Sequence, residues 1–288
     1  SYWSQLDAAI RNELCEGATR GIYSGNGLLV VQCANILGAF YAIEFPLGTY
    51  EEQIAALLEQ TSISTDQNER HAALSVFLSF TRVSIDICPT CGKDQMFYQF
   101  SPVLFHNILA QMNDPSDEHL QQLAASILGD SLSFFFRPVS FPTAMDALME
   151  TIFEFIHSDN LFVYGFTILR RTIDYFYNYL TNYKEAIVEI LNENIQSENS
   201  DRIFQSCTIL NLIGEVEADI ETEDKTQVKL RHRDFDTNHG FAVFCFDHLL
   251  EPLLHLVMNI EETDILHSSP NLVVLICIVD LAKAVGEE

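Results

Sequence analysis

Apolar residues recur every three to four positions along most of the chain, with polar residues between them. This spacing places the apolar side chains on one face of an α-helix. The longest stripe consists of Phe162, Phe166, Leu169, Ile173, Phe176 and Leu180. No segment alternates apolar and polar residues between turn signals, which is the pattern of a strand. The sequence therefore predicts an all-α protein.

The predicted helices form six consecutive pairs, because turn-forming residues interrupt the pattern at intervals. The pairs begin roughly every 40–55 residues, near the period of HEAT and armadillo repeats, about 40–47. A single pair cannot bury its apolar face alone, so neighbouring pairs stack. We predict one HEAT-repeat α-solenoid over residues 1–288, in preference to an irregular helical bundle. The expected pairs are 3–44 (helices 3–17 and 26–44), 49–85 (49–60 and 67–85), 100–136 (100–113 and 117–136), 141–181 (141–157 and 160–181), 183–220 (183–195 and 199–220) and 237–286 (237–260 and 269–286).

Local signals support several of these helix starts. Thr49 and Glu52 have the spacing of a capping box. Ser269 precedes Pro270, a residue that suits the first position of a helix. Residues 220–237 form a long connection that is acidic first and basic afterwards. Connections of this length in compact domains are usually functional or mobile.

The chain is strongly acidic, because 41 Asp and Glu residues oppose 15 Lys and Arg residues and give a formal net charge of −26. Binding to a nucleic-acid backbone needs a basic surface, so nucleic acid is excluded as the main partner. An anionic membrane surface repels such a chain as well. The charge favours basic proteins or basic peptides as partners.

Polar residues interrupt the two longest apolar runs. Residues 28–43 contain Gln32 and Asn35, and residues 241–258 contain Asp247, His248, Glu251, Pro252 and His255. A membrane-spanning helix needs about 20 predominantly apolar residues, so we expect no membrane insertion. No signal peptide is visible. The cysteines number seven, an odd count, and most lie on apolar helix faces, which favours a reducing intracellular compartment.

Few residues are candidates for catalysis or metal binding. Cys88 and Cys91 have the spacing of half a zinc site, but a structural zinc ion needs four ligands and no second Cys-x-x-Cys pair exists. Residues 88–93 equally suit a loop between helices, so we expect no metal. His248 and His255 share a helix but supply only two ligands. No nucleophile elbow, phosphate loop or dinucleotide-binding motif is present, and we expect neither a cofactor nor enzymatic activity.

Residues 32–61 carry a more specific signal. They contain Gln-Cys at 32–33, Ala-Ile-Glu-Phe-Pro at 42–46 and Tyr-Glu-Glu-Gln-Ile at 50–54. This order resembles the amino-terminal arch of importin-β, the nuclear import receptor. Residues 103–132 are similar to the family's fifth repeat, residues 141–220 keep the lengths of the sixth and seventh, and residues 239–264 are similar to the eighth. The resemblance covers nearly the whole chain and implies a fragment of a longer receptor.

The resemblance also implies partners and sites. Members of the family move between cytoplasm and nucleus through the nuclear pore. They bind Phe-Gly nucleoporins on the convex face, the GTPase Ran on inner repeats, and basic cargo or an importin-α-like adaptor on the concave face. Carried over by position, the nucleoporin slot is formed by Phe105, His106, Leu109, Ala144, Ala147 and Leu148. The family's acidic loop, which helps to hold Ran and basic adaptors, corresponds to Glu261, Glu262 and Asp264. This stretch has fewer acids than the family's loop and lacks its Trp, so we expect weaker binding through it.

Alternatives remain open for both the slot and the function. Phe105 and Leu109 are four residues apart and share a helix face, so both can belong to the core instead. The chain can also be a helical-repeat scaffold or adaptor without a transport role, or a small zinc-assisted module. Binding to a Phe-Gly repeat resin separates a transport receptor from a scaffold.

Overall fold

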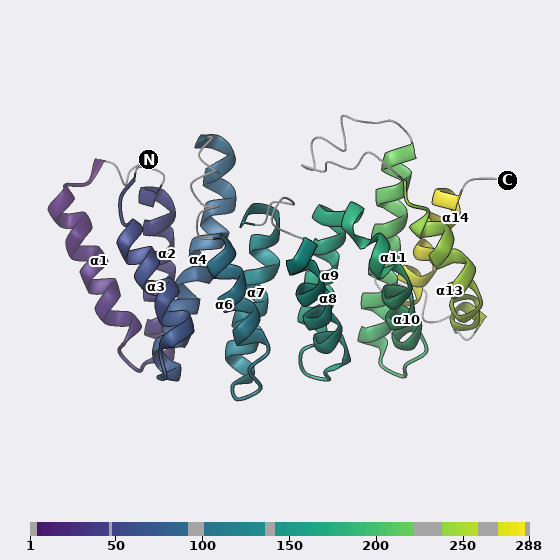
Figure 1. Cartoon of the computed structure of the whole chain (residues 1–288), viewed down its shortest axis with the longest axis horizontal. Helices are drawn as coiled ribbons and strands as arrows, with labels where there is room; N and C mark the ends of the chain where they lie inside the picture. The colour runs from purple at the N-terminus through teal and green to yellow at the C-terminus, as the bar shows by residue number, and fades with distance from the viewer. Residues whose placement is uncertain are drawn as a thin grey trace. The chain divides into compact units, whose positions relative to one another are not determined.

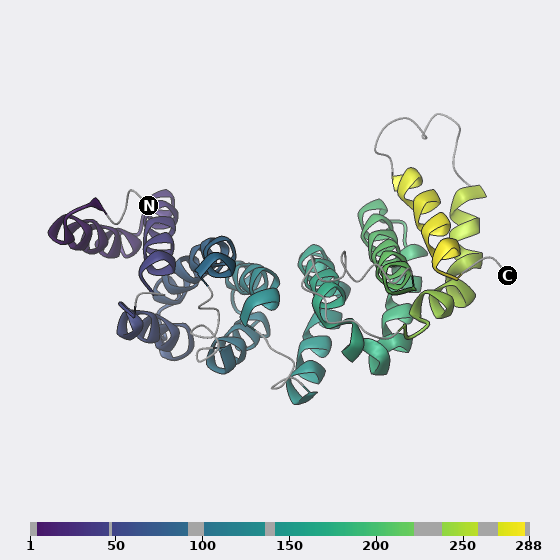
Figure 2. The same cartoon turned by 90° about the horizontal axis from the view of Figure 1, so that it is seen from above.

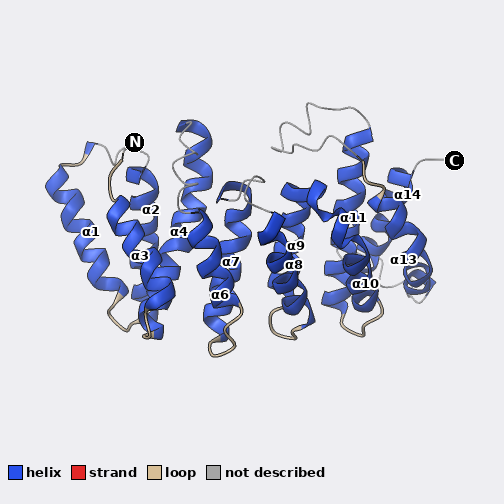
Figure 3. Ribbon diagram, viewed as in Figure 1, coloured by secondary structure: helices blue, strands red, loops and turns tan. Residues whose placement is uncertain are grey.

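The computed structural model describes residues 5–45, 48–91, 101–135, 142–221, 238–258 and 270–285 (Figure 1). In these ranges the regular structure is helical and no strand occurs, as the hydrophobic pattern predicts (Figure 3). The chain divides into two compact units, Ser1–Phe141 and Pro142–Glu288, and each is described by itself.

The described part of the first unit is built from three helix pairs. Its helices are α1 (Ala8–Ile22), α2 (Gly27–Glu44), α3 (Glu51–Ile63), α4 (Gln67–Cys91), α6 (Ser101–Met112) and α7 (Glu118–Phe135). Helix α1 packs on α2, α3 on α4, and α6 on α7. The pairs also stack, because α2 packs on α4, α4 packs on α7, and α3 contacts α6.

The second unit repeats this arrangement. Its helices are α8 (Pro142–His157), α9 (Phe162–Phe176), the 3₁₀ helix η4 (Tyr177–Tyr183), α10 (Lys184–Ile195), α11 (Ser200–Glu221), α13 (Phe241–Met258) and α14 (Pro270–Val285). The second helices of the pairs, α9, α11 and α14, form one row, and α8, α10 and α13 form the other (Figure 2). Helix α14 begins at Pro270, as the Ser-Pro signal predicts.

Stacked helix pairs are the architecture of a HEAT-repeat α-solenoid, and this part of the sequence prediction is confirmed. The stripes predicted to be apolar faces form the core. Phe166, Leu169 and Ile173 of α9 are at most 1% exposed. The fold therefore follows from helical periodicity, with each pair covering the apolar face of the next.

The first helix does not lie where the pattern predicts. Helix α1 spans Ala8–Ile22, whereas the prediction places it at residues 3–17 and ends it at Gly17. The helix continues through Gly17 and Gly21 because its second half packs closely on α2. A Cβ atom on Gly21 would lie 2.2 Å from the sulfur of Cys33, so glycine permits this close approach.

Two helix ends also differ from the prediction. Helix α4 continues to Cys91 instead of ending near residue 85, because no glycine or proline precedes Pro89 in this helix. Residues 88–91 of the expected break therefore belong to the helix, and residues 92 and 93 lie outside the described residues. Helix α9 ends at Phe176, and the rest of its predicted range forms the 3₁₀ helix η4. The residues of η4 are mainly Tyr, Asn and Thr, which have low helix propensity.

The capping box predicted at Thr49 and Glu52 is wrong. The Thr49 hydroxyl donates to the carbonyl oxygen of Glu44 at 2.8 Å and to its carboxylate at 3.2 Å. Tyr50 precedes α3 in the left-handed region, with φ 65°, and no side chain caps the helix. This conformation is uncommon for a residue with a side chain. It is held by packing of the Tyr50 ring on Phe40, with ring centroids 4.7 Å apart.

In the described residues, α2 and α13 are long and apolar enough to cross a membrane when judged by length and composition alone. A helix in the core of a globular protein passes the same test. Helix α2 packs on α1 and α4, and α13 packs on α10, α11 and α14. Neighbouring helices of the same unit therefore cover part of the apolar surface of α2 and of α13.

Replacing Gly38 with alanine is expected to lower the free energy of unfolding by about 2 kcal/mol. A Cβ atom at this position of α2 would lie 2.5 Å from the Cβ of Ser79 and 2.6 Å from the backbone nitrogen of Phe80, so α2 and α4 would have to separate. Urea unfolding measures the change. Gly17→Ala is the matched control, because a Cβ atom on Gly17 of α1 would meet nothing within 4 Å. It should stabilise the helix by up to about 1 kcal/mol, and equal losses in both variants would contradict the close-packing argument.

Candidate binding surfaces

The first wall of the predicted nucleoporin slot lies on α6, which packs on α3 and α7. Phe105 and Leu109 are 9% and 8% exposed, so only their edges reach the surface, whereas His106 is exposed. The side-chain amide of the buried Asn107 donates to the carbonyl oxygen of Leu58 at 3.0 Å and attaches α6 to α3. This wall therefore offers one imidazole and two largely covered apolar side chains.

The second predicted wall lies on α8, in the other unit. Leu148 is fully buried, Ala144 is half-buried and Ala147 is exposed. Because α6 and α8 belong to different units, the two walls are described separately. Of the six predicted residues, His106 and Ala147 are the exposed ones and the suitable positions for substitution.

Helices α8 and α10 carry two rows of exposed carboxylates that the sequence analysis did not single out. In each row the residues are four apart, so they share a helix face. The rows are Asp146, Glu150 and Glu154 on α8, and Glu185, Glu189 and Glu193 on α10. The spacing was visible in the sequence, but the proximity of the two helices was not.

Two contacts join α8 to the residues around α10. The Tyr183 hydroxyl donates to Asp146, and His157 lies 3.4 Å from the carboxylate of Glu193. Burial, followed by the hydrogen bond to Asp146, raises the pKa of Tyr183 to about 12. Neither helix adds an Arg, and the ammonium group of Lys184 is directed to the backbone carbonyls before α13. The two rows therefore attract basic groups.

A buried carboxylate holds the start of α13. Glu217 of α11 accepts hydrogen bonds from the backbone N–H groups of Phe241 at 2.6 Å and Ala242 at 2.8 Å, and from the Tyr177 hydroxyl. A negative charge is favourable at this positive end of a helix. Burial, followed by the charge of Glu217, raises the pKa of Tyr177. Burial, followed by the same charge, raises the pKa of Cys245.

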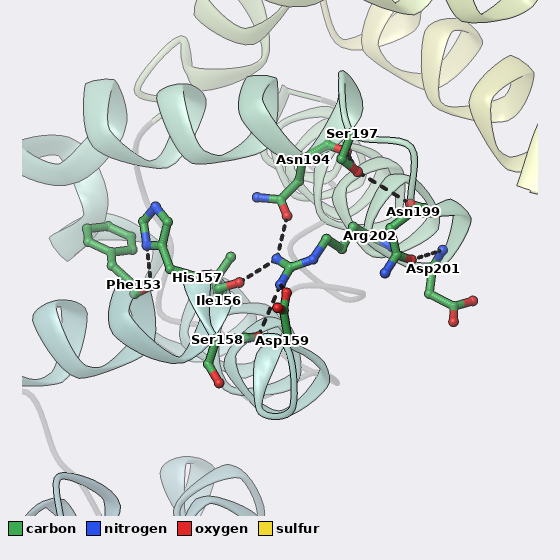
Figure 4. A network of polar contacts seen from close by, with 10 residues as sticks. All are labelled: Phe153, Ile156, His157, Ser158, Asp159, Asn194, Ser197, Asn199, Asp201 and Arg202. Carbon is green, nitrogen blue, oxygen red and sulfur yellow. Dashed lines mark hydrogen bonds and ion pairs between the residues drawn. The ribbon is translucent and has the colours of Figure 1, made fainter. Parts of the chain in front are cut away.

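Arg202 makes a second polar network, at the end of α8 (Figure 4). Its guanidinium group donates to the carbonyl oxygens of Ile156 at 2.6 Å and Ser158 at 3.1 Å, and to the side-chain oxygen of Asn194 at 3.0 Å. It also lies over the Phe162 ring, 4.5 Å from the centroid. These contacts join α8, α9, α10 and α11. They satisfy the carbonyl oxygen of Ile156 in the last turn of α8 and give the carbonyl oxygen of Ser158 a second donor beside the backbone N–H of Phe162.

Several predicted features fall on parts of the chain that the structure does not describe. The acidic-loop residues Glu261, Glu262 and Asp264 lie outside the described residues, as does most of the 220–237 connection. The side chains of Cys88 and Cys91 are outside them as well. Among the residues described, no three His, Cys, Asp or Glu side chains are placed to hold a metal ion.

No protein-family model matches the sequence, and a comparison with curated proteins gives no match either. Solved structures do resemble the chain. Importin-β crystallised in ammonium sulfate matches with a TM-score of 0.81 and 20% identity, over 99% of this chain and 33% of that chain. Yeast importin-β, Kap95p, matches with a TM-score of 0.83 and 17% identity, over 99% of this chain and 33% of that chain. An engineered protein matches less well, with a TM-score of 0.56 and 13% identity, over 96% of this chain and 100% of that chain.

Complexes of Kap95 match as well. The complex of Kap95 with Nup1 has a TM-score of 0.82 and 17% identity, over 98% of this chain and 32% of that chain. The chain spans about a third of the length of the solved importin-β chains that it matches. Because the sequence identity is 17–20%, these matches concern the arrangement of the helices in space. The chain has the HEAT-repeat α-solenoid fold that importin-β also has.

Proposed function

We propose that the chain is part of a nuclear import receptor, which carries proteins through the nuclear pore between cytoplasm and nucleus. The match to importin-β over 99% of the chain carries this proposal. The resemblance of residues 32–61 supports it from the sequence. Transport by such a receptor rests on binding, so we infer that the chain is not an enzyme.

The proposed partners are a Phe-Gly nucleoporin and the GTPase Ran. Kap95 is solved in complex with Nup1 and with RanGDP, and we extend both kinds of partner to this chain. The proposed nucleoporin contacts are His106 with the edges of Phe105 and Leu109 on α6 and, as a separate position, Ala147 on α8. The acidic loop at residues 261–264 is proposed as a minor contact for Ran.

The proposed cargo is a basic protein or an importin-α-like adaptor. The net charge of −26 supports this choice, and so do the two carboxylate rows on α8 and α10. Charge of one sign steers an oppositely charged partner during encounter, with an effect that salt weakens.

We propose further that the two units continue as one solenoid over residues 1–288. X-ray scattering in solution is expected to give a radius of gyration well above about 19 Å, the value for a compact domain of 288 residues. Stacked helix pairs contact only their neighbours, so an array of them is elongated. A value near that of a compact domain would contradict the single solenoid.

Retention on an immobilised Phe-Gly repeat peptide tests the transport function. The wild-type chain is expected to bind, through several weak sites that act together, since burying one phenylalanine contributes about 1.5–3 kcal/mol. The double variant His106→Glu/Ala147→Glu should bind about fivefold more weakly or worse, because it places carboxylates where phenylalanine rings are proposed to enter. Both positions are exposed, so the fold should persist, whereas Leu109→Asp would place a charge in a buried position.

Ala282→Glu is the matched control, because Ala282 is an exposed alanine on α14, which carries none of the proposed contact residues. It should be retained like the wild type. Failure of the wild type to bind would favour a HEAT-repeat scaffold or adaptor without a transport role. Equal retention of the double variant and the wild type would place the contact elsewhere.

A further inference from the structure

Almost every cation in the described residues is engaged inside the chain. Ion pairs join Arg11 to Glu44, Arg20 to Glu16, Arg70 to Asp114, Arg82 to Asp130, Arg202 to Asp159 and Lys283 to Asp280, and Lys184 binds two backbone carbonyls. Arg170 and Arg171 of α9 differ from these residues. Both are exposed, and neither makes an ion pair or hydrogen bond within the described part of the chain. Two adjacent unpaired cations stand out in a chain with a net charge of −26.

Two contacts establish how α9 and its extension η4 lie against α11. Arg202 lies over the ring of Phe162, and the Tyr177 hydroxyl donates to Glu217. Each contact joins residues 40 positions apart, since 202 − 162 and 217 − 177 both equal 40. The two segments therefore run parallel, and the same offset places Arg171 level with Asn211 of α11. Helices α9 and α11 pack directly on each other.

The surface shared by these helices, called here the α9–α11 surface, consists of Val163, Arg170, Arg171, Phe204 and Asn211. Val163 and Phe204 lie near the starts of their helices and are 43% and 37% exposed. Arg170 follows Val163 by seven residues, about 10 Å along the axis. The side-chain oxygen of Asn211 is buried and has no hydrogen-bond donor among the described residues. The surface thus presents an apolar end and two guanidinium groups.

We propose that the α9–α11 surface binds an acidic segment of another protein that also carries an apolar side chain. The guanidinium groups of Arg170 and Arg171 match carboxylates in shape and charge. The apolar side chain packs on Val163 and Phe204 and sets the direction of the segment. The net charge of the chain repels an acidic partner at a distance, so short-range contacts at this surface determine the binding. This partner is opposite in charge to the basic cargo proposed above.

Selection from an unbiased library of displayed peptides, about 16 residues long, tests the proposal on the full chain. Peptides selected by the wild type but not by Arg170→Glu/Arg171→Glu should be acidic and contain Leu, Ile or Phe. A fluorescein-labelled synthetic copy of the most enriched peptide should bind the double variant about fivefold more weakly or worse. Raising NaCl from about 50 to about 300 mM should weaken its binding to the wild type, because salt screens exposed charges.

Arg20→Glu/Lys283→Glu is the matched control, since it makes the same change in net charge at side chains that are 75% and 66% exposed. It should bind the peptide like the wild type, whereas Val163→Asn/Phe204→Asn should bind about threefold more weakly or worse.

Retention of Arg170→Glu/Arg171→Glu on the Phe-Gly resin should equal that of the wild type, which separates this proposal from the transport function. Three results would overturn the proposal. The selected peptides could be basic or neutral, or the wild type and the variant could select the same peptides. A single-stranded oligonucleotide could also displace the labelled peptide at a lower concentration than the unlabelled peptide does.

Discussion

Replacing Glu217 with alanine is expected to lower the free energy of unfolding by about 4 kcal/mol. The carboxylate is fully buried and accepts hydrogen bonds from two N–H groups of α13 and from the Tyr177 hydroxyl. Alanine removes the acceptor of all three donors and leaves a void. A buried donor without a partner costs about 1–3 kcal/mol, although relaxation reduces the sum. Urea unfolding followed by circular dichroism measures the loss.

Glu215→Ala is the matched control for Glu217→Ala. Glu215 lies on the same helix but is exposed, and among the described residues its carboxylate accepts one hydrogen bond, from Asn211 at 3.3 Å. Its loss should change stability by less than about 0.5 kcal/mol. Glu217→Gln should lose about 2 kcal/mol, since one oxygen remains an acceptor while the new amide group opposes an N–H donor. A loss below about 1 kcal/mol in Glu217→Ala would mean that water replaces the carboxylate, and hydrogen exchange at the start of α13 would show it.

The helix pairs were predictable because the same side chains carry the pattern and form the core. The stripe that begins at Phe162 and includes Leu169 and Ile173 is buried along α9. Helix ends were less predictable because they depend on neighbours. Gly21 lies inside α1 since the sulfur of Cys33, on the next helix, occupies the space of a side chain. A local rule that ends helices at glycine has no access to that contact.

The candidate sites were predictable only in part. The resemblance supplied the slot positions, but whether Phe105 is covered depends on α3 and α7, which pack on its helix. Glu217 was missed although it interrupts an apolar stripe with Ile213 and Val216, a position where an acid needs donors. Those donors belong to residues 241 and 242, on the far side of the long connection. No local pattern indicates such a distant partner.

Replacing Arg202 with methionine is expected to lower the free energy of unfolding by about 3 kcal/mol. A cation in the first turn of a helix is unfavourable for the helix dipole, so its presence at the start of α11 needs compensation from elsewhere. The side chain is 12% exposed and donates hydrogen bonds to Ile156, Ser158, Asn194 and Asp159 in the network of Figure 4. It also lies over the ring of Phe162. Methionine keeps much of the apolar packing but leaves the carbonyl oxygens of Ile156 and Ser158 without this donor. Urea unfolding of both proteins measures the difference.

The ion pair with Asp159 contributes little to this loss. The Asp159 side chain is 99% exposed and lies 3.2 Å from the guanidinium group, and an exposed pair is worth only about 0–1 kcal/mol. Asp159→Asn should therefore cost less than about 0.5 kcal/mol. The loss of stability in Arg202→Lys should lie between those of Asp159→Asn and Arg202→Met. One ammonium group lacks the fork geometry of arginine and cannot reach both carbonyl oxygens and Asn194. If Asp159→Asn is as destabilising as Arg202→Met, charge pairing rather than carbonyl capping holds α8 to α11.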